Sequence, residues 1–249
     1  MTDPVFLPGV PAAAVLAALR RAPGNELASG KFDSPDSSAA LVANAFGWFL
    51  GRAKSLPPLP GVPMGQPDEV QIEAEMRFPW TGGRHPWMDA VLTTPTSLVG
   101  VESKRYEPFR PRKSPIFSEA YDSRDWGPGM GRFTAMRVAL TTGRQTYRHL
   151  DAVQLVKHAY GLKTQSVKRA RGAVLVYLHA APAHWASGKP VDPKAITRHQ
   201  AEIADFARAV KGDDVSFVPL RWSDLLAQWA KEPALFAHAT ALTGWFGSL

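Results

Sequence analysis

Hydrophobic and polar residues alternate regularly between positions 69 and 77. Every second position is apolar, and the positions between them carry a charge or an amide. The apolar positions are Val70, Ile72, Ala74 and Met76. This period of two predicts a half-buried strand. Two further apolar runs follow after short turns, at residues 88–94 and 97–104, and strands joined by short turns predict an antiparallel meander.

The rest of the chain shows helical periods and continuous apolar runs. We predict helices over residues 11–21, 37–54, 144–161, 196–210 and 222–229, and strands over 172–180 and 214–220. The strand 172–180 is apolar throughout, so it should be central and covered on both faces. For residues 105–143, rich in proline and glycine, we expect a long functional loop or short local helices. This order predicts an α/β fold with a mixed central sheet flanked by helices, in a single domain spanning 1–249.

The composition narrows the classes of function. The chain has 249 residues, 29 Lys and Arg against 22 Asp and Glu, a formal net charge of +7, and no cysteine. The lack of cysteine excludes a disulfide-stapled secreted scaffold, a thiolate metal site and thiol catalysis, and the positive charge permits a polyanionic partner. No apolar run reaches the roughly 20 residues of a membrane span. The N-terminal apolar stretch carries Asp3 and no basic segment before it, so we expect a short helix of a cytoplasmic protein there, not a signal peptide.

Three charged residues lie on the second and third predicted strands. Asp89 is in the second, whereas Glu102 and Lys104 are two positions apart in the third and therefore share a face. A hairpin that turns at residues 94–97 would bring Asp89 level with Glu102. Two carboxylates suit Mg²⁺ or Mn²⁺, to which the carbonyl of Ser103 would add an oxygen ligand. A lysine beside such a cation can hold the attacking water or counter charge on a phosphate. The competing interpretation is a charged strand end that faces solvent.

The segments P-W-M-D at 86–89 and E-S-K at 102–104 resemble the signature of the PD-(D/E)XK nuclease superfamily, which is an acid, a hairpin and then acid-x-Lys. Here the acid follows the proline by three positions instead of one. The predicted elements from about 36 to 180 are similar to the superfamily's restriction-endonuclease-like αβββαβ core. The helix 11–21 would precede this core, and residues 181–249 would form a C-terminal α/β elaboration.

The resemblance implies a nuclease that hydrolyses nucleic-acid phosphodiester bonds with Mg²⁺ or Mn²⁺, and DNA is a better candidate substrate than RNA. Asp89 and Glu102 would be the metal ligands, and Lys104 would support the attacking water. A homodimer is expected if the enzyme cuts both strands.

Other superfamily members use a further acid and a residue from the helix after the third strand. Glu75 is the candidate acid, or else part of a solvated strand face, which is the interpretation that we favour for Glu73. Gln154 is the candidate on the helix, where it would bind phosphate or orient water. Four basic residues are candidates for contacts to the nucleic-acid backbone, with an ordinary basic surface as the alternative. They are Arg105, Lys157, Lys168 and Arg169.

Two other functions stay open from the sequence. One is a catalytically inactive basic module of the same fold that binds nucleic acid or a partner protein. The other is an enzyme that uses the same acids on a small phosphate ester. The aromatic residues between 106 and 126 would stack on bases if they were exposed, or else pack into the core. The sequence contains none of the motifs that characterise acyl hydrolases, P-loop enzymes or dinucleotide-binding enzymes.

Overall fold

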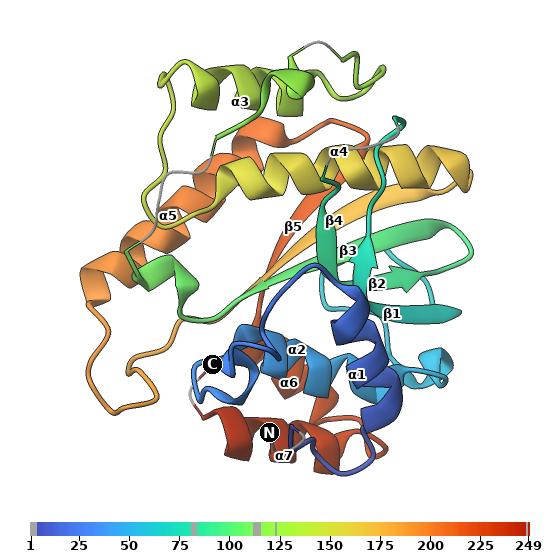
Figure 1. The fold of residues 1–249 in the computed structure, drawn as a ribbon, viewed down its shortest axis with the longest axis vertical. Helices are drawn as coiled ribbons and strands as arrows, with labels where there is room; N and C mark the ends of the chain where they lie inside the picture. Colours follow the sequence, from blue (N-terminus) through green and yellow to red (C-terminus); the bar gives the residue numbers. More distant parts are fainter. Residues whose placement is uncertain (1–3, 81–83, 112–115, 123, 248) are drawn as a thin grey trace.

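The computed structural model describes residues 4–80, 84–111, 116–122, 124–247 and 249. Its centre is a mixed sheet of five strands in the order β1-β2-β3-β4-β5 (Figure 1). The first three strands, β1 (Glu69–Glu75), β2 (Trp87–Thr93) and β3 (Ser97–Lys104), form the predicted antiparallel meander. Strands β4 (Gly172–His179) and β5 (Val215–Arg221) lie parallel to β3. The predicted α/β class with a mixed sheet is confirmed.

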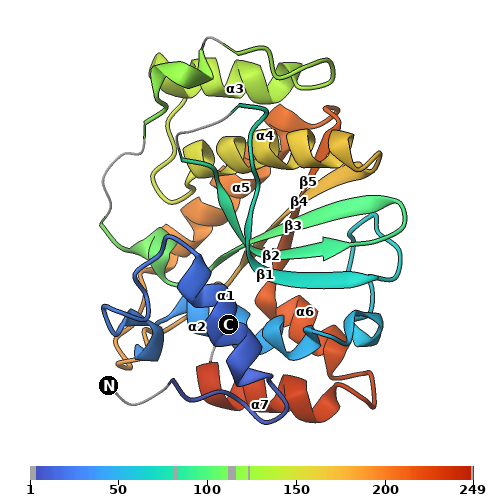
Figure 2. The ribbon, with the colours of Figure 1, turned by 45° about the vertical axis from the view of Figure 1, so that its right-hand side comes forward.

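Helices cover both faces of the sheet (Figures 1 and 2). On one face lie α1 (Ala12–Arg21), α2 (Ser38–Ala45), α6 (Trp222–Trp229) and α7 (Phe236–Phe246). On the other face lie α4 (Ala152–Lys168) and α5 (Pro193–Val210), with α3 (Gly131–Thr141) packed on these two helices. Each face has its own hydrophobic core. As predicted, β4 is central, and seven of its eight residues are buried.

The bounds of two predicted helices were wrong. The helix predicted over 37–54 ends at Ala45, and two short 3₁₀ turns follow it, separated by Gly51 in a left-handed conformation with φ +75°. The helix predicted over 144–161 begins only at Ala152 and runs through Gly161 to Lys168. Gly161 lies inside the helix, where the lack of a side chain allows α4 to pack closely against the residues that follow β1. A Cβ at Gly161 would lie 2.7 Å from the Cβ of Met76.

The region between β3 and α4 contains structure that the sequence did not predict in detail. Its described residues form α3 and two 3₁₀ turns, at Glu107–Phe109 and Glu119–Tyr121. Its aromatic residues are mostly inside, since Tyr106, Tyr121 and Trp126 are all buried. These rings therefore serve packing, which was one of the two alternatives from the sequence. No helix in the described part of the chain is long and apolar enough to cross a membrane.

Strand β1 changes its orientation at Glu73. This residue has φ +48°, a left-handed conformation that is rare outside glycine and asparagine. Before it, Ile72 faces the core beneath α1 and α2, whereas Ala74, two positions later, faces the core beneath α4. The even positions therefore change faces, and the hydrogen-bonded register with β2 omits the pair of Glu73 and Asp89. The irregularity lies directly opposite a candidate site residue.

Candidate active site

The site begins where β2 and β3 separate. The antiparallel register of these strands runs from Thr93 opposite Leu98 to Ala90 opposite Val101 and stops there. Asp89 is the next residue, and its Oδ2 accepts a hydrogen bond of 2.6 Å from the backbone N–H of Ser103. The carboxylate thus takes the place that a strand carbonyl would occupy in a continued ladder. Asp89 is fixed at the opening between two strands.

Glu102 and Lys104 lie beside Asp89 on the α4 side of β3. The ammonium of Lys104 donates a short hydrogen bond to Oε1 of Glu102, and Glu102 is only 1% exposed. The other oxygen, Oε2, lies 3.3 Å from Nδ1 of His158 on α4. Burial and the charge of Lys104 lower the pKa of His158 to about 3, so the imidazole is neutral at pH 7. The structure brings together Asp89, Glu102 and Lys104.

The charges in this cluster are poorly compensated. Burial, and then the charge of Glu102, raise the pKa of Asp89 well above its ordinary value, although Lys104 opposes this. Burial also raises the pKa of Glu102, against the effect of Lys104. Burial by itself would lower the pKa of Lys104, but the surrounding carboxylates raise it, so the lysine is charged. Two carboxylates therefore share one ammonium in a place with little water.

Glu73 is a third carboxylate at this cluster, although the sequence favoured a solvated strand face for it. Burial raises the pKa of Glu73 to about 8, and the charges of Asp89, Glu26 and Glu102 add to the increase. Glu75, for which the sequence left both the additional ligand and a solvated strand face open, lies beyond the irregularity in β1 and pairs with Arg77 at 3.7 Å. Strict alternation would place Glu73 and Glu75 on the same face of the strand. The left-handed conformation at Glu73 separates them, and no pattern in the sequence predicts this conformation.

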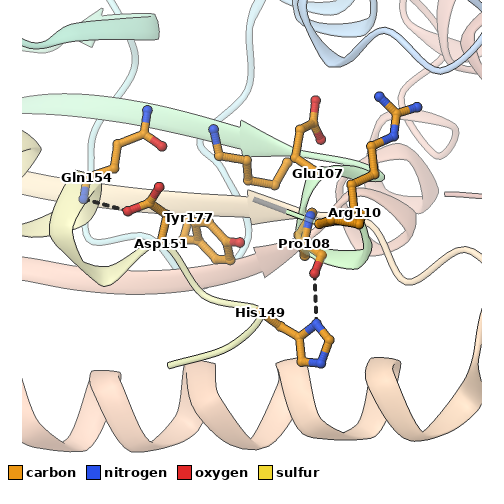
Figure 3. Close-up of a pocket in the computed structure, with 9 residues that line it drawn as sticks. Glu107, Pro108, Arg110, His149, Asp151, Gln154 and Tyr177 are labelled. Carbon is orange, nitrogen blue, oxygen red and sulfur yellow. Dashed lines mark hydrogen bonds between the residues drawn. The ribbon is translucent and has the colours of Figure 1, made fainter. Parts of the chain in front are cut away.

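Helix α4 supplies the next part of the site, from its first turn. The side chain of Asp151 accepts a hydrogen bond of 2.9 Å from the backbone N–H of Gln154, which is a helix cap. Gln154 then lines a pocket of about 310 Å³ together with Lys104 (Figure 3). The other residues around this pocket come from three segments. They are Glu107, Pro108, Arg110, Pro111, His149, Asp151 and Tyr177.

Helix α5 positions one wall of this pocket through Glu202. The carboxylate of Glu202 accepts hydrogen bonds from the backbone N–H groups of Arg148, His149 and Leu150, at 2.9, 2.7 and 2.9 Å. It also pairs with Arg198 one turn earlier on α5. This single side chain therefore fixes the segment that carries His149 and leads into the first turn of α4.

We expect Glu202→Gln to lower the free energy of unfolding at pH 7 by about 1–2 kcal/mol, because three amides lose a charged acceptor. Burial by itself would raise the pKa of Glu202, but the three amides and Arg198 lower it below its ordinary 4.5. A lowered pKa in the folded state stabilises the protein above the unfolded value, and the contribution is lost as the pH falls through the folded value. Denaturant unfolding from pH 7 to about 3 should therefore show the two proteins converging. A difference independent of pH would contradict this, and exposed Glu232→Gln is the control.

The basic residues named from the sequence do not gather at the site. Arg105 is wrong as a nucleic-acid contact, because it is 1% exposed and donates to the carbonyls of Pro35 and Phe246. Lys157 donates to the carbonyl of Ile116 at 3.0 Å. Lys168 and Arg169 are exposed at the far end of α4. Gln154 and Lys168 are 14 positions apart, which corresponds to about 21 Å of helix.

The donors that the sequence motif offers to a metal ion are oxygens. They are the carboxylates of Asp89 and Glu102 and the carbonyl of Ser103. In a strand, the N–H and C=O of one residue point toward the same neighbouring strand. Because the Ser103 N–H reaches Asp89, its carbonyl points toward the same opening. Among the described residues, no three His, Asp or Glu side chains form a ready cluster, so the carbonyl would have to complete the set.

Comparisons with known proteins found no match to this chain among family models, curated proteins or solved structures.

Proposed function

We propose that this protein is a metal-dependent nuclease that hydrolyses phosphodiester bonds, in DNA rather than RNA. The observation that carries the proposal is the meeting of Asp89 and Glu102 at the opening between β2 and β3, with Lys104 in contact with Glu102. This arrangement supports the resemblance to the PD-(D/E)XK superfamily that the spacing of these residues suggests. The positive net charge of +7 is consistent with a polyanionic substrate.

The residues present fit a hard divalent cation. Oε2 of Glu102 is buried and accepts no hydrogen bond from the described residues. The raised pKa values of Asp89 and Glu102 show that their negative charges are undercompensated, and such carboxylates prefer Mg²⁺ or Mn²⁺. Asp89, Glu102 and the carbonyl of Ser103 would hold the ion. When bound, it would polarise the phosphate and lower the pKa of a coordinated water.

The chain's own residues account for the remaining requirements of the reaction. Lys104 is charged and less than one-fifth exposed, so its ammonium can orient a water and counter the negative charge that develops on the phosphate. The side-chain amide of Gln154 lines the same pocket and can donate to a phosphate oxygen. His158 contacts Glu102 from α4 and limits the orientations of that carboxylate.

A cleavage assay tests the proposal. Purified protein is incubated with supercoiled plasmid and with single-stranded DNA, in Mg²⁺, in Mn²⁺ or with a chelator. We expect cleavage only with a metal ion, and its loss in Glu102→Gln but not in the exposed control Glu232→Gln. Equal cleavage by both variants would indicate a contaminant and contradict the proposal. Binding of DNA without cleavage under any condition would favour the inactive basic module instead.

A further inference from the structure

Trp87 lies on β2 two residues before Asp89, at the opening where β2 and β3 separate. Two residues of a strand span about 7 Å, so Trp87 is a close neighbour of the proposed metal site. Met88, between the two, is fully buried in the core beneath α4. Trp87 is only half-buried and belongs to neither hydrophobic core of the described chain. The interior of the protein therefore does not account for a tryptophan at this position.

The indole of Trp87 differs from most others in this protein in having no polar or aromatic partner. Among the described residues, no second ring, cation or hydrogen-bonding group contacts it. Tryptophan normally pairs its N–H and its ring faces when it is partly buried. Six of the eight tryptophans do pack against another aromatic ring, namely Trp48, Trp80, Trp126, Trp185, Trp222 and Trp229. An unpartnered indole beside the acid cluster is therefore a candidate for contact with a ligand.

Arg77 adds a cation on the same face of the β1–β2 hairpin. Trp87 lies directly opposite Glu75 on β1, and opposite residues of an antiparallel pair share a face. Nε of Arg77 is 3.7 Å from Oε2 of Glu75, and the arginine side chain is 62% exposed. An exposed ion pair of this length is weak, so the guanidinium is available to a phosphate. An aromatic ring with a neighbouring cation is the combination that binds single-stranded nucleic acids.

Stacking on an indole requires a base with a free face. Inside a duplex, neighbouring base pairs cover both faces of every base, whereas a single strand can present a base to an aromatic side chain. Such stacking tolerates any sequence, because every base has a π-face. Trp87 and Arg77 therefore suit a ligand that is recognised by its strandedness and not by its sequence.

We propose that Trp87 stacks on the base of the nucleotide next to the scissile phosphate, and that Arg77 contacts a phosphate of the same strand. The proposal rests on the nuclease function above and names its substrate as unpaired DNA, either a single strand or an unpaired stretch within a plasmid. Asp89 and Glu102 then act on the phosphate, while Trp87 holds the adjacent base. Trp87 and Arg77 are substrate-binding residues in this assignment.

Binding measured in a chelator tests the stacking without cleavage. The full chain is titrated into three fluorescent ligands, which are a single-stranded DNA oligonucleotide, an abasic oligonucleotide of the same length, and a closed duplex without free ends. We expect Trp87→Ala to weaken binding of the single strand about tenfold and to leave binding of the other two unchanged. Trp87→Phe retains an aromatic face and should stay within about threefold of wild type. Trp245→Ala on α7 is the matched control, since Trp245 is 55% exposed.

Arg77 requires a readout of charge instead of stacking. We expect Arg77→Gln to weaken binding of the ordinary and the abasic single strand by the same factor. It should also reduce the slope of log affinity against log salt concentration by about 0.7, the value for one phosphate contact to a single strand. Arg208→Gln is the matched control, because Arg208 is also exposed and also pairs with an acid, Asp205. Circular dichroism melting identifies any variant that has not folded, and Trp87→Leu, which keeps apolar volume without a π-face, replaces Trp87→Ala in that case.

Each outcome bears on one proposal. If Trp87→Ala binds the single strand as wild type does, or if the wild type binds no single strand, the stacking proposal is overturned. An equal loss on the closed duplex overturns the claim that the base is unpaired, and an unchanged salt dependence in Arg77→Gln overturns the phosphate contact. If binding depends on Trp87 but no metal ion supports cleavage, the nuclease proposal fails while the stacking site stands.

Discussion

Asp89→Asn should reduce metal-dependent DNA cleavage by about a thousandfold or more, because it removes one of the two carboxylates proposed as metal ligands. Asn keeps the shape of the side chain and an oxygen that can accept the hydrogen bond from the backbone N–H of Ser103, which is 2.6 Å long in the native protein. The opening between β2 and β3 is therefore preserved, and the loss of activity can be attributed to the lost negative charge of Asp89. Initial rates of plasmid cleavage measure it, with exposed Asp68→Asn, directly before β1, as the control.

The same substitution should stabilise the protein without metal ions by about 1 kcal/mol or more at pH 8. The pKa of Asp89 is raised well above its ordinary 3.8, chiefly by burial and then by Glu102. A carboxyl group with a raised pKa in the folded state costs stability as the pH rises above its unfolded value. Denaturant unfolding in a chelator should show a gain for Asp89→Asn that grows from pH 4 to 8. A loss of stability across this range would contradict the electrostatic account of the site.

Metal ions should act in the opposite direction on the wild type. A bound cation compensates Asp89 and Glu102, so Mn²⁺ should raise the melting temperature of the wild type and leave that of Asp89→Asn nearly unchanged. The three measurements together separate a metal site from a buried ion pair that serves the fold alone, because only a metal site links cleavage, stability and cation concentration.

Much of the site could be predicted from the sequence because it lies on regular strands. The alternation of apolar and polar residues that includes Val70 and Ile72 predicts the first strand of the meander. The short turn before Ser97 predicts that the second and third strands are antiparallel neighbours. The spacing of Glu102 and Lys104 then places both side chains on one face. A local pattern carries this information whenever the backbone follows the standard strand geometry.

The rest could not be predicted because it depends on irregular backbone and on distant contacts. Glu73 reaches the site through a left-handed conformation that alternation does not reveal. Arg105 looked like part of a basic patch, but the packing of α7 buries it against the carbonyl of Phe246, 141 positions away. His199 meets Tyr177 only because α5 crosses the same face as α4. Such contacts are properties of the packed molecule.

Lys104→Met should reduce cleavage by about 10²- to 10⁴-fold, the usual contribution of a positioned acid or base. Unlike Asp89→Asn, it should also destabilise the protein, by about 3 kcal/mol, because Glu102 is left buried without its cation. Protonation of Glu102 limits that loss, so the destabilisation should be larger at pH 8 than at pH 5. Denaturant unfolding in a chelator and plasmid cleavage measure the two effects, with exposed Lys211→Met as the control.

The two substitutions are coupled through the shared charge. In Asp89→Asn, Lys104 has one carboxylate fewer to compensate, so Lys104→Met should leave a smaller charge imbalance in that background than in the wild type. The double variant should therefore be more stable than the sum of the single effects predicts, by about 0.5–3 kcal/mol, the range for residues in one network. If the two effects on the free energy of unfolding were strictly additive, Lys104 would interact electrostatically with Glu102 but not with Asp89. In that case the three residues would not act as one site, and the nuclease proposal would lose the geometry on which it depends.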